Sequence, residues 1–199
     1  MRHPTIGITG GMGCGKSEVG RILSEIGVEI MDSDALSHDL LREDESVKTA
    51  VIALCGPDVQ RADGELDRAA IAAQVFSDES KRKALEALIH PRVWETIQRW
   101  RTARKNVAPA AALIPLLFEA GLTDGWDAIW CISAPDAVVN ERLRGRGWSL
   151  EQIERRRRVQ LPLEEKMRRS DLVIRNEGTR EELKTNILES WTTLLKRSK

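Results

Sequence analysis

The sequence predicts an α/β fold, with a parallel sheet of about five strands, helices on both faces, a helical insertion and a lid. Two observations support this prediction. Short apolar and β-branched runs alternate with segments of helical periodicity towards both ends of the chain, whereas the middle is helical throughout. A glycine-rich segment separates the first predicted strand from the first predicted helix, and ligands of open parallel sheets bind beyond such strand ends.

Five segments are expected to form the strands: residues 4–9, 28–31, 110–119, 127–133 and 171–174. The third is a mostly apolar run that suits a buried central strand. Pro115 argues against regular pairing late in this run. Glu119, at its end, should face the ligand side of the sheet.

The predicted strands separate a core from the segments between them. We expect one unit over 1–199, with its core at about 1–42, 106–141 and 171–199, a helical insertion at about 43–105 and a lid at about 142–170.

Within the insertion, Asp67 should cap a helix over 68–76, and a helix over 81–89 should follow. His90-Pro91 should then start a further helix, since proline suits a first helical turn. Arg68, His90 and Arg92 are candidates for contacting a second substrate, with an ordinary surface or capping role as the alternative.

Residues 10–17 read Gly-Gly-Met-Gly-Cys-Gly-Lys-Ser and match the phosphate-binding pattern G-x-x-x-x-G-K-[ST] in full. Glycines allow positive φ and close approach of the backbone to an anion, and a helix N-terminus adds partial positive charge. Lys16 can reach the β- and γ-phosphates, and the Ser17 hydroxyl can bind Mg²⁺. We therefore predict a nucleotide-binding loop rather than a glycine-rich turn that binds nothing.

Bulk composition argues against several other classes. Lys+Arg and Asp+Glu both number 31, so nucleic-acid binding driven by overall charge has no support. The three cysteines lie far apart and lack metal-ligand spacing. The N-terminus has no apolar signal region, and no stretch is long enough to span a bilayer. We expect a cytoplasmic enzyme that binds no membrane.

Two carboxylates, Asp32 and Asp34, follow the second predicted strand. They should lie close to phosphates held by the glycine-rich loop, since both follow carboxyl ends of parallel strands. One could take a proton from an attacking hydroxyl, and either could help to position Mg²⁺. One of the pair could equally be a helix cap.

Arginines crowd the segment between the last two predicted strands. Arg142 lies just beyond a strand end and is a functional candidate. The run 155–158 fits two interpretations equally: a solvated helix face, or part of a lid that closes over anions.

The chain resembles the dephospho-coenzyme A kinase family along nearly its full length. The glycine-rich loop alone is shared by many kinases, so the ordered set of shorter pieces carries the resemblance. The matching pieces are 8–17, Asp32-Ser33-Asp34, Gly64-Glu65-Leu66-Asp67-Arg68, His90-Pro91, Pro115-Leu116-Leu117-Phe118-Glu119, Gln160…Lys166 and 171–178.

The resemblance implies a P-loop kinase core, a helical domain that receives the coenzyme A precursor, and a lid. It implies transfer of the ATP γ-phosphate to the ribose 3′-hydroxyl of dephospho-CoA, the last step of coenzyme A synthesis, by a monomer or small homo-oligomer. Asp34 would be the general base, Asp32 would support it or the metal, Lys16 would act on the transferring group, and Arg142 would contact the phosphates.

The resemblance also implies three sets of binding residues. Those expected at ATP are Gly11, Met12, Gly13, Cys14, Gly15, Lys16, Ser17, Glu18, Arg142, Asn176 and Gly178. Those expected at the acceptor are Asp34, Leu66, Asp67, Arg68, His90, Leu117 and Glu119. Ser17 and Asp32 are expected at Mg²⁺.

One position departs from the family pattern, and two rival classes remain. The family loop usually reads G-K-S-T, whereas Glu18 follows Ser17 here and should modestly weaken the local positive potential. A nucleoside or nucleoside-monophosphate kinase would have no reason for the L-D-R and H-P pieces. A P-loop regulatory switch should show N-K-x-D, which the chain lacks.

Overall fold

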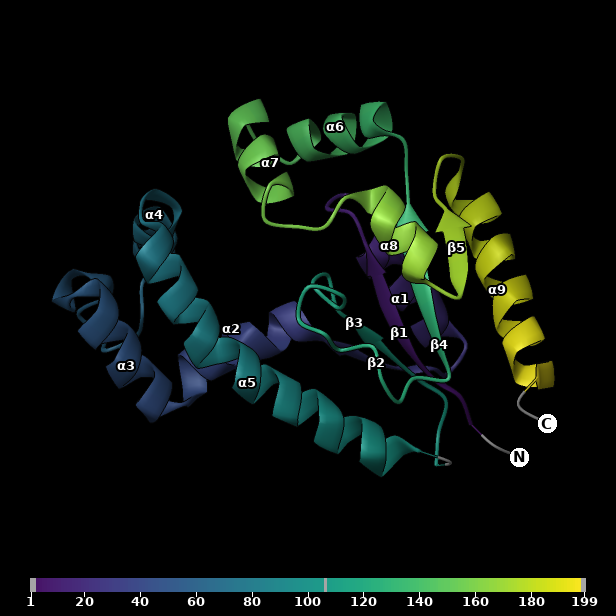
Figure 1. The fold of residues 1–199 in the computed structure, drawn as a ribbon, viewed down its shortest axis with the longest axis horizontal. Helices are drawn as coiled ribbons and strands as arrows, with labels where there is room; N and C mark the ends of the chain where they lie inside the picture. The colour runs from purple at the N-terminus through teal and green to yellow at the C-terminus, as the bar shows by residue number, and fades with distance from the viewer. Residues whose placement is uncertain (1–2, 106, 198–199) are drawn as a thin grey trace. The chain divides into compact units, whose positions relative to one another are not determined.

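A five-stranded parallel sheet forms the centre of the first of two compact units in this computed structural model, which describes residues 3–105 and 107–197 (Figure 1). The first unit comprises Met1–Asp32 and Trp100–Lys199, and the second comprises Ser33–Arg99. The strands are β1 (Thr5–Gly10), β2 (Glu29–Asp32), β3 (Ala110–Leu113), β4 (Ala128–Ser133) and β5 (Leu172–Arg175), in the spatial order β2-β3-β1-β4-β5. The predicted fold class and the number of strands are confirmed.

The central strand β1 pairs with β3 on one side and with β4 on the other. All of its residues are buried, as are those of β3 and β4. The chain crosses from one side of β1 to the other between β3 and β4, so the carboxyl end of β1 lies at the point where the strand order reverses direction. Open sheets bind ligands at such a point.

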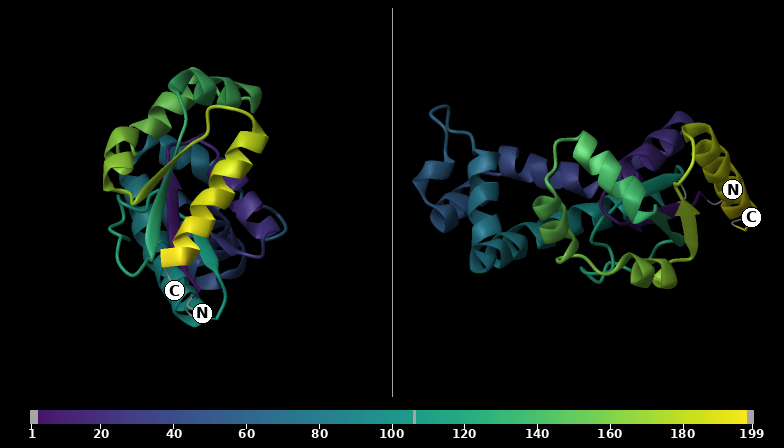
Figure 2. Two further views of the ribbon diagram at one scale, coloured as in Figure 1. Left: turned by 90° about the vertical axis from the view of Figure 1, so that its right-hand side faces the viewer. Right: turned by 90° about the horizontal axis from the view of Figure 1, so that it is seen from above.

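Helices α1 (Lys16–Glu25) and α9 (Arg180–Arg197) cover one face of the sheet. Alternate residues of the strands point into this layer, where Ile6 and Ile8 are fully buried. Trp130 of β4 meets Trp191 of α9 edge to face, with ring centroids 6.0 Å apart. Figures 1 and 2 show α9 running beside β5.

Three further helices belong to the first unit: α6 (Asp136–Gly145), α7 (Leu150–Arg157) and α8 (Leu163–Arg169). Helix α8 packs on β1 and β4. Helix α7 begins with a capping box, in which Ser149 and Gln152 each accept a hydrogen bond from the other's backbone N–H. A second box, Thr179 with Glu182, opens α9.

The second unit is helical and has its own core. Its elements are α2 (Ser33–Glu43), α3 (Glu45–Cys55), the short 3₁₀ helix η1 (Pro57–Val59), α4 (Arg68–Ser77) and most of α5 (Glu79–Arg104). Val47, Val51, Val59, Leu66 and Ile71 form its buried centre. The unit begins at Ser33 rather than near residue 43, because α2 starts directly after β2 and packs with α3.

The expectation that His90-Pro91 starts a helix is wrong, because α5 runs through Pro91 without a break. A proline inside a helix removes one backbone hydrogen bond and costs about 3 kcal/mol. Ile89, Val93 and Ile97 are buried along one face of α5 on both sides of the proline. Continuous burial of this face therefore outweighs the local cost of the proline. The His90-Pro91 pair by itself does not reveal this burial.

The strand expected over 110–119 is also shorter in the structure, since β3 ends at Leu113. The Ile114 N–H still donates to the Ile8 carbonyl at 2.8 Å, but Pro115 has no N–H with which to continue the pairing. The chain turns away instead, and the Ala120 N–H donates to the Leu116 carbonyl at 3.0 Å.

Asp67 caps α4 as expected, since its side chain accepts hydrogen bonds from the N–H groups of Ala69 at 2.8 Å and Ala70 at 3.1 Å. Asp67→Ala should lower the free energy of unfolding of the second unit by about 1 kcal/mol. Asp67→Asn should keep most of the stability that the cap contributes. Urea unfolding of both variants measures the effect. An Asp67→Ala protein with unchanged stability but weakened acceptor binding would instead make Asp67 a ligand contact.

Candidate active site

The loop between β1 and α1 folds in a way that only glycine permits at two positions. Gly10 has φ 143° and Gly15 has φ 101°, both in the range that side chains disfavour. A Cβ at Gly10 would lie 2.2 Å from the Ile132 carbonyl oxygen, and one at Gly15 would lie 2.2 Å from Asn176 Nδ2. Close neighbours and backbone conformation therefore both require these glycines.

Lys16 and Ser17 occupy the first positions of α1, directly after the loop. Gly15 is the N-cap and supplies no side-chain cap, so the positive end of the helix meets the loop without a capping oxygen. Lys16 Nζ donates to the carbonyls of Gly10 at 3.0 Å and Gly11 at 2.9 Å, which holds the ammonium group over the loop. The Ser17 residue is exposed.

Cys14 lies inside the loop and is almost completely buried, with 1% of its surface exposed. Burial raises the pKa of its thiol above the usual value, and the nearby Lys16 charge opposes this shift only in part. The thiol is therefore a neutral packing group of the loop.

Asn176, which follows β5, joins three parts of the site. Its Nδ2 donates to the Cys14 carbonyl at 2.8 Å. Arg142 of α6 donates from Nη2 to the Asn176 carbonyl at 3.2 Å and to its Oδ1 at 3.3 Å. Arg142 Nη1 is buried and has no hydrogen-bond partner among the described residues. The structure thus brings Arg142 and Asn176 together with the loop, as the family resemblance implied.

Glu18 does not leave an unbalanced negative charge beside the loop. Its carboxylate pairs with Arg21 at 2.5 Å and with Arg180 of α9 at 2.7 Å. Hydrogen bonding from Arg21, followed by that from Arg180, holds the pKa of Glu18 below its usual value. The weakening of the positive potential expected from the sequence is therefore offset by two cations.

One of the two aspartates ends β2, and the other lies two residues further on. Asp32 is the last residue of this strand, half-buried and in register with Leu113 of β3, which in turn pairs with Ile8 of β1. Asp34 is exposed and lies in the first turn of α2, where a carboxylate interacts favourably with the helix N-terminus. Asp32 therefore lies at the same edge of the sheet as the phosphate loop.

A pocket of about 370 Å³ in the second unit brings together three of the residues expected at the acceptor, Leu66, Asp67 and Arg68. Arg68 Nη2 lies 2.5 Å from His38 Nε2. The other lining residues are Leu41, Arg42, Arg61, Glu65 and Ala69. The basic residues at 38, 42 and 61 were not predicted to line a pocket, although the spacing of His38 and Arg42 by one helical turn could have indicated a shared face. His90 is not among the lining residues, and it is exposed in the middle of α5.

Leu117 and Glu119, which the family resemblance placed at the acceptor, lie in the turn that follows β3. Leu117 is fully buried, and a Cβ on Gly7 would lie 2.7 Å from its Cδ1, which is the position of a packing residue. Glu119 lies six residues beyond the end of β3 and its Oε1 is 2.8 Å from Lys166 Nζ. The expectation that Glu119 faces the ligand side of the sheet assumed a strand that continued to residue 119, whereas the acceptor contacts of both residues were implied by the family resemblance.

The segment expected to act as a lid divides into two parts. Its last part, α8, is docked on the sheet, with Lys166 fully buried. The arginine run before it points in several directions, as helical geometry requires: Arg155 pairs with Glu151 at 2.6 Å, and Arg156 stacks on Trp148 at 4.0 Å. Arg157 pairs with Asp136 at 2.9 Å.

A pocket of about 340 Å³ lies between the phosphate loop and this segment. Gly11, Met12 and Cys14 line it from the loop. On the other side it is lined by Arg157, the last residue of α7, and by Gln160 and Leu161, which follow this helix. Of the four adjacent arginines, Arg157 is the one that lines this pocket.

Ser17 and Asp32 suit a Mg²⁺ ion, because hydroxyl and carboxylate oxygens are ligands that this ion accepts. No group of three or more His, Cys, Asp or Glu residues that could hold a metal occurs within 3–105 or 107–197. In the same ranges, no helix is sufficiently long and apolar to cross a membrane.

A phosphate loop at the reversal point of a parallel sheet, with Lys16, Arg142 and Asp32 around it, defines a P-loop phosphotransferase. The family model described as dephospho-CoA kinase matches residues 4–182. The chain belongs to the dephospho-CoA kinase family.

Curated relatives and solved structures agree with this assignment. The dephospho-CoA kinase of Geobacillus kaustophilus is 38% identical over 198 residues, covering 96% of this chain and 98% of the relative. That of Geobacter sulfurreducens is 37% identical, covering 94% and 96%. A crystal structure from Thermus thermophilus superposes with a TM-score of 0.78 at 36% identity, covering 96% and 98%. The dephospho-CoA kinase of Campylobacter jejuni, at 22% identity and a TM-score of 0.69 with 98% of both chains covered, shows the same fold.

Replacing Glu18 should have little effect on nucleotide binding. Glu18→Thr should change the KM for ATP by less than about threefold, because two arginines already offset the carboxylate. Arg180→Ala provides the contrast, since it leaves Glu18 with one partner and should raise this KM, more at low salt than at high salt. Steady-state kinetics at two ionic strengths test both variants, and a tenfold gain in ATP affinity from Glu18→Thr would contradict the balance of charges.

Proposed function

We propose that this chain transfers the γ-phosphoryl group of ATP to the ribose 3′-hydroxyl of dephospho-CoA, giving coenzyme A and ADP, with Mg²⁺ as cofactor. The observation that carries the proposal is the phosphate loop with its intact Gly15-Lys16-Ser17 sequence, set in a chain that matches the family over residues 4–182. The proposal includes action in the cytoplasm as a monomer or small homo-oligomer, without nucleic acid or membrane.

Charge neutralisation falls to Lys16 and Arg142. The Lys16 ammonium group lies over the loop, where it can move from the Gly10 and Gly11 carbonyls to phosphate oxygens. Arg142 Nη1 is a buried donor without a partner among the described residues, which is costly unless an anion accepts from it. Fixed positive groups of this kind stabilise the charge that spreads over the transferring phosphoryl group.

Asp34 is the proposed general base, and Asp32 supports it or the metal. In this reaction one proton leaves the attacking hydroxyl, and a carboxylate within hydrogen-bond reach can accept it. Asp32 and the Ser17 hydroxyl would hold Mg²⁺, which neutralises charge on the β- and γ-phosphates when bound. The protein's remaining task is to align the hydroxyl with the γ-phosphate.

The pocket of the second unit is the proposed place for the acceptor. Dephospho-CoA carries a pyrophosphate, and guanidinium groups bind such groups well. Arg68 and Arg61 line this pocket, and so does His38. Leu66 and Asp67 serve mainly to build it, since Leu66 is 7% exposed and Asp67 caps α4.

A coupled assay for ADP formation tests the reaction. The purified chain with Mg²⁺ and ATP is offered dephospho-CoA, adenosine, AMP or no acceptor. Turnover with dephospho-CoA alone, with phosphate found at the 3′ position, supports the proposal. Faster turnover with adenosine or AMP would favour a nucleoside or nucleotide kinase, and slow hydrolysis that no acceptor accelerates would favour a regulatory switch.

Lys16→Ala should reduce phosphoryl transfer to less than about one hundredth while the protein still folds, because the lysine charge acts mainly on the transferring group. Turnover number is measured beside circular dichroism as a check on folding. A variant that retained a third of wild-type turnover would refute the role assigned to Lys16.

Asp34→Asn should lower turnover by about 10²-fold or more through loss of the positioned base, and ATP binding should be largely kept. Asp32→Asn is the matched variant, with the same change two residues away. Turnover and the KM for ATP are measured for both. A severe loss in Asp32→Asn together with a nearly normal Asp34→Asn would reverse the two roles.

A further inference from the structure

Helix α8 contains a lysine without any exposed surface. Lys166 is 0% exposed, and its Nζ donates to the Pro115 carbonyl at 2.7 Å and lies 2.8 Å from Glu119 Oε1. The Pro115 carbonyl also accepts from Thr9 Oγ1 at 3.2 Å. Thr9 directly precedes Gly10, so the lysine is linked through one carbonyl to the strand that enters the phosphate loop.

The same carboxylate oxygen holds a backbone group of the segment between α7 and α8. The Leu161 N–H donates to Glu119 Oε1 at 2.8 Å. Leu161 and its neighbour Gln160 line the pocket beside the phosphate loop. Glu119 therefore connects the core directly to the point where the arginine-bearing segment returns to the sheet.

Stability alone is a weak explanation for this pair. Removing two charges from water is costly, and an apolar pair of similar size is often as stable or more so. Glu119 Oε2 is buried without a hydrogen-bond partner among the described residues, which adds to the cost. What the pair does provide is a fixed geometry among Thr9, the loop after β3, Leu161 and α8.

We propose that Glu119 is a positioning residue for phosphoryl transfer, which holds the segment after α7 at Leu161 while Lys166 balances its buried charge. The pair contacts no substrate itself. It keeps residues 157–161 against the phosphate loop, so that Arg157 and Gln160 line the pocket and water has less access to the γ-phosphate. This inference rests on the proposed kinase reaction, and it is an alternative to the acceptor contact that the family resemblance implied for Glu119.

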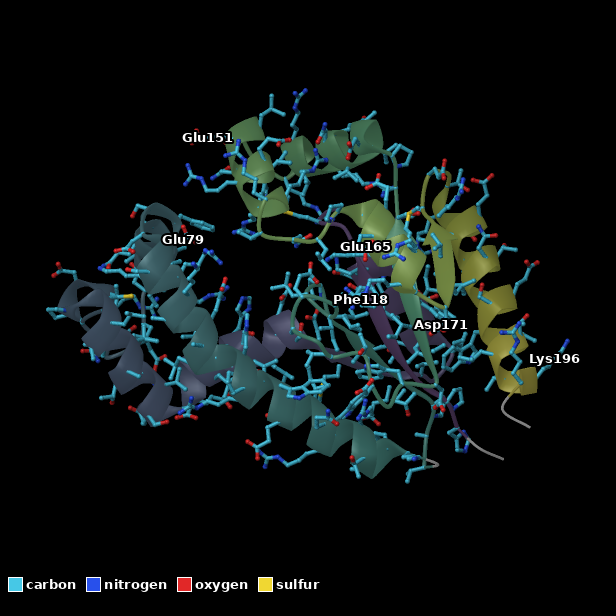
Figure 3. All side chains as sticks on the ribbon, in the orientation of Figure 1. Glu79, Phe118, Glu151, Glu165, Asp171 and Lys196 are labelled. Atoms are coloured by element: carbon cyan, nitrogen blue, oxygen red, sulfur yellow. The ribbon has the colours of Figure 1, made fainter. Side chains whose placement is uncertain are left out.

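Two double variants separate the hydrogen bond to Leu161 from the buried charges. Glu119→Gln with Lys166→Met removes both charges and keeps a side-chain oxygen for the Leu161 N–H. Glu119→Leu with Lys166→Met removes the charges and this acceptor together. A control on the exposed face of α8 is Glu165→Gln with Arg168→Met, which breaks an exposed ion pair of 2.8 Å. Phe118 and Glu165, labelled in Figure 3, are the chain neighbours of Glu119 and Lys166.

The first readout is amide exchange, which needs no substrate. Exchange in a peptide covering 158–162 should be about tenfold or more faster in the Leu/Met variant than in the wild type, because the Leu161 N–H has lost its acceptor. The Gln/Met variant and the α8 surface control should stay within about threefold of the wild type. Equal exchange in the two double variants would overturn the proposal.

The second readout is steady-state kinetics, in which effects on kcat and on KM are compared separately. The Leu/Met variant should lose about tenfold or more in kcat and hydrolyse more ATP per phosphoryl group transferred, with the KM for dephospho-CoA nearly unchanged. The Gln/Met variant should stay within about threefold of the wild type in kcat. If kcat fell in proportion to the melting temperature, and by the same amount in both double variants, the pair would have a structural role only. Inactive wild-type protein would refute the proposed reaction, while the exchange result would still test the hydrogen bond.

Discussion

The hydrogen bond from Asn176 to the Cys14 carbonyl is the contact on which the nucleotide site depends most. A trans peptide points its C=O and N–H in opposite directions, so fixing the Cys14 carbonyl also turns the Gly15 N–H away from Asn176. The close approach leaves no space for a Cβ on Gly15. Asn176 reaches this position because β5 pairs with β4, which lies beside β1. The same asparagine accepts from Arg142, so the loop, the edge of the sheet and the arginine are set by one side chain.

Local patterns were sufficient to predict the strands, the phosphate loop and the helix start at Asp67. Each of these features is encoded within a few residues, as periodicity, as a motif or as a capping side chain. The structural effects of Pro91 and Pro115 were harder to predict, because one proline lies inside a continuous helix and the other follows the end of a strand. A buried face carries α5 through Pro91, whereas β3 stops where Pro115 cannot donate. Which outcome occurs depends on packing that adjacent residues do not encode.

The site residues also divide into those that the sequence identified and those whose contacts only the fold reveals. The loop residues were found from their motif, and Arg142 and Asn176 from the family resemblance. The acceptor roles that the resemblance implied for Glu119 and Leu117 stay predictions, although the strand expected to reach residue 119 ends at Leu113. The pairing of Glu18 with Arg180 was not foreseen, since this partner is 162 positions away in the chain. Lys166 ends one of the pieces that match the family, but its burial was not foreseen, because only the fold brings it to Pro115, 51 positions earlier. Contacts between distant segments thus account for most of what the sequence left open.

The buried thiol of Cys14 has a consequence for the chemistry that the loop must withstand. Thiol–disulfide exchange proceeds through the thiolate, and a raised pKa together with burial keeps Cys14 protonated and out of reach of other sulfur compounds. Coenzyme A and its precursor both end in a thiol, and their oxidised forms are disulfides. An ionised cysteine in this loop would be open to mixed disulfides with the very molecules that the family handles. Burial lets the loop use cysteine as a small packing residue while remaining inert to them.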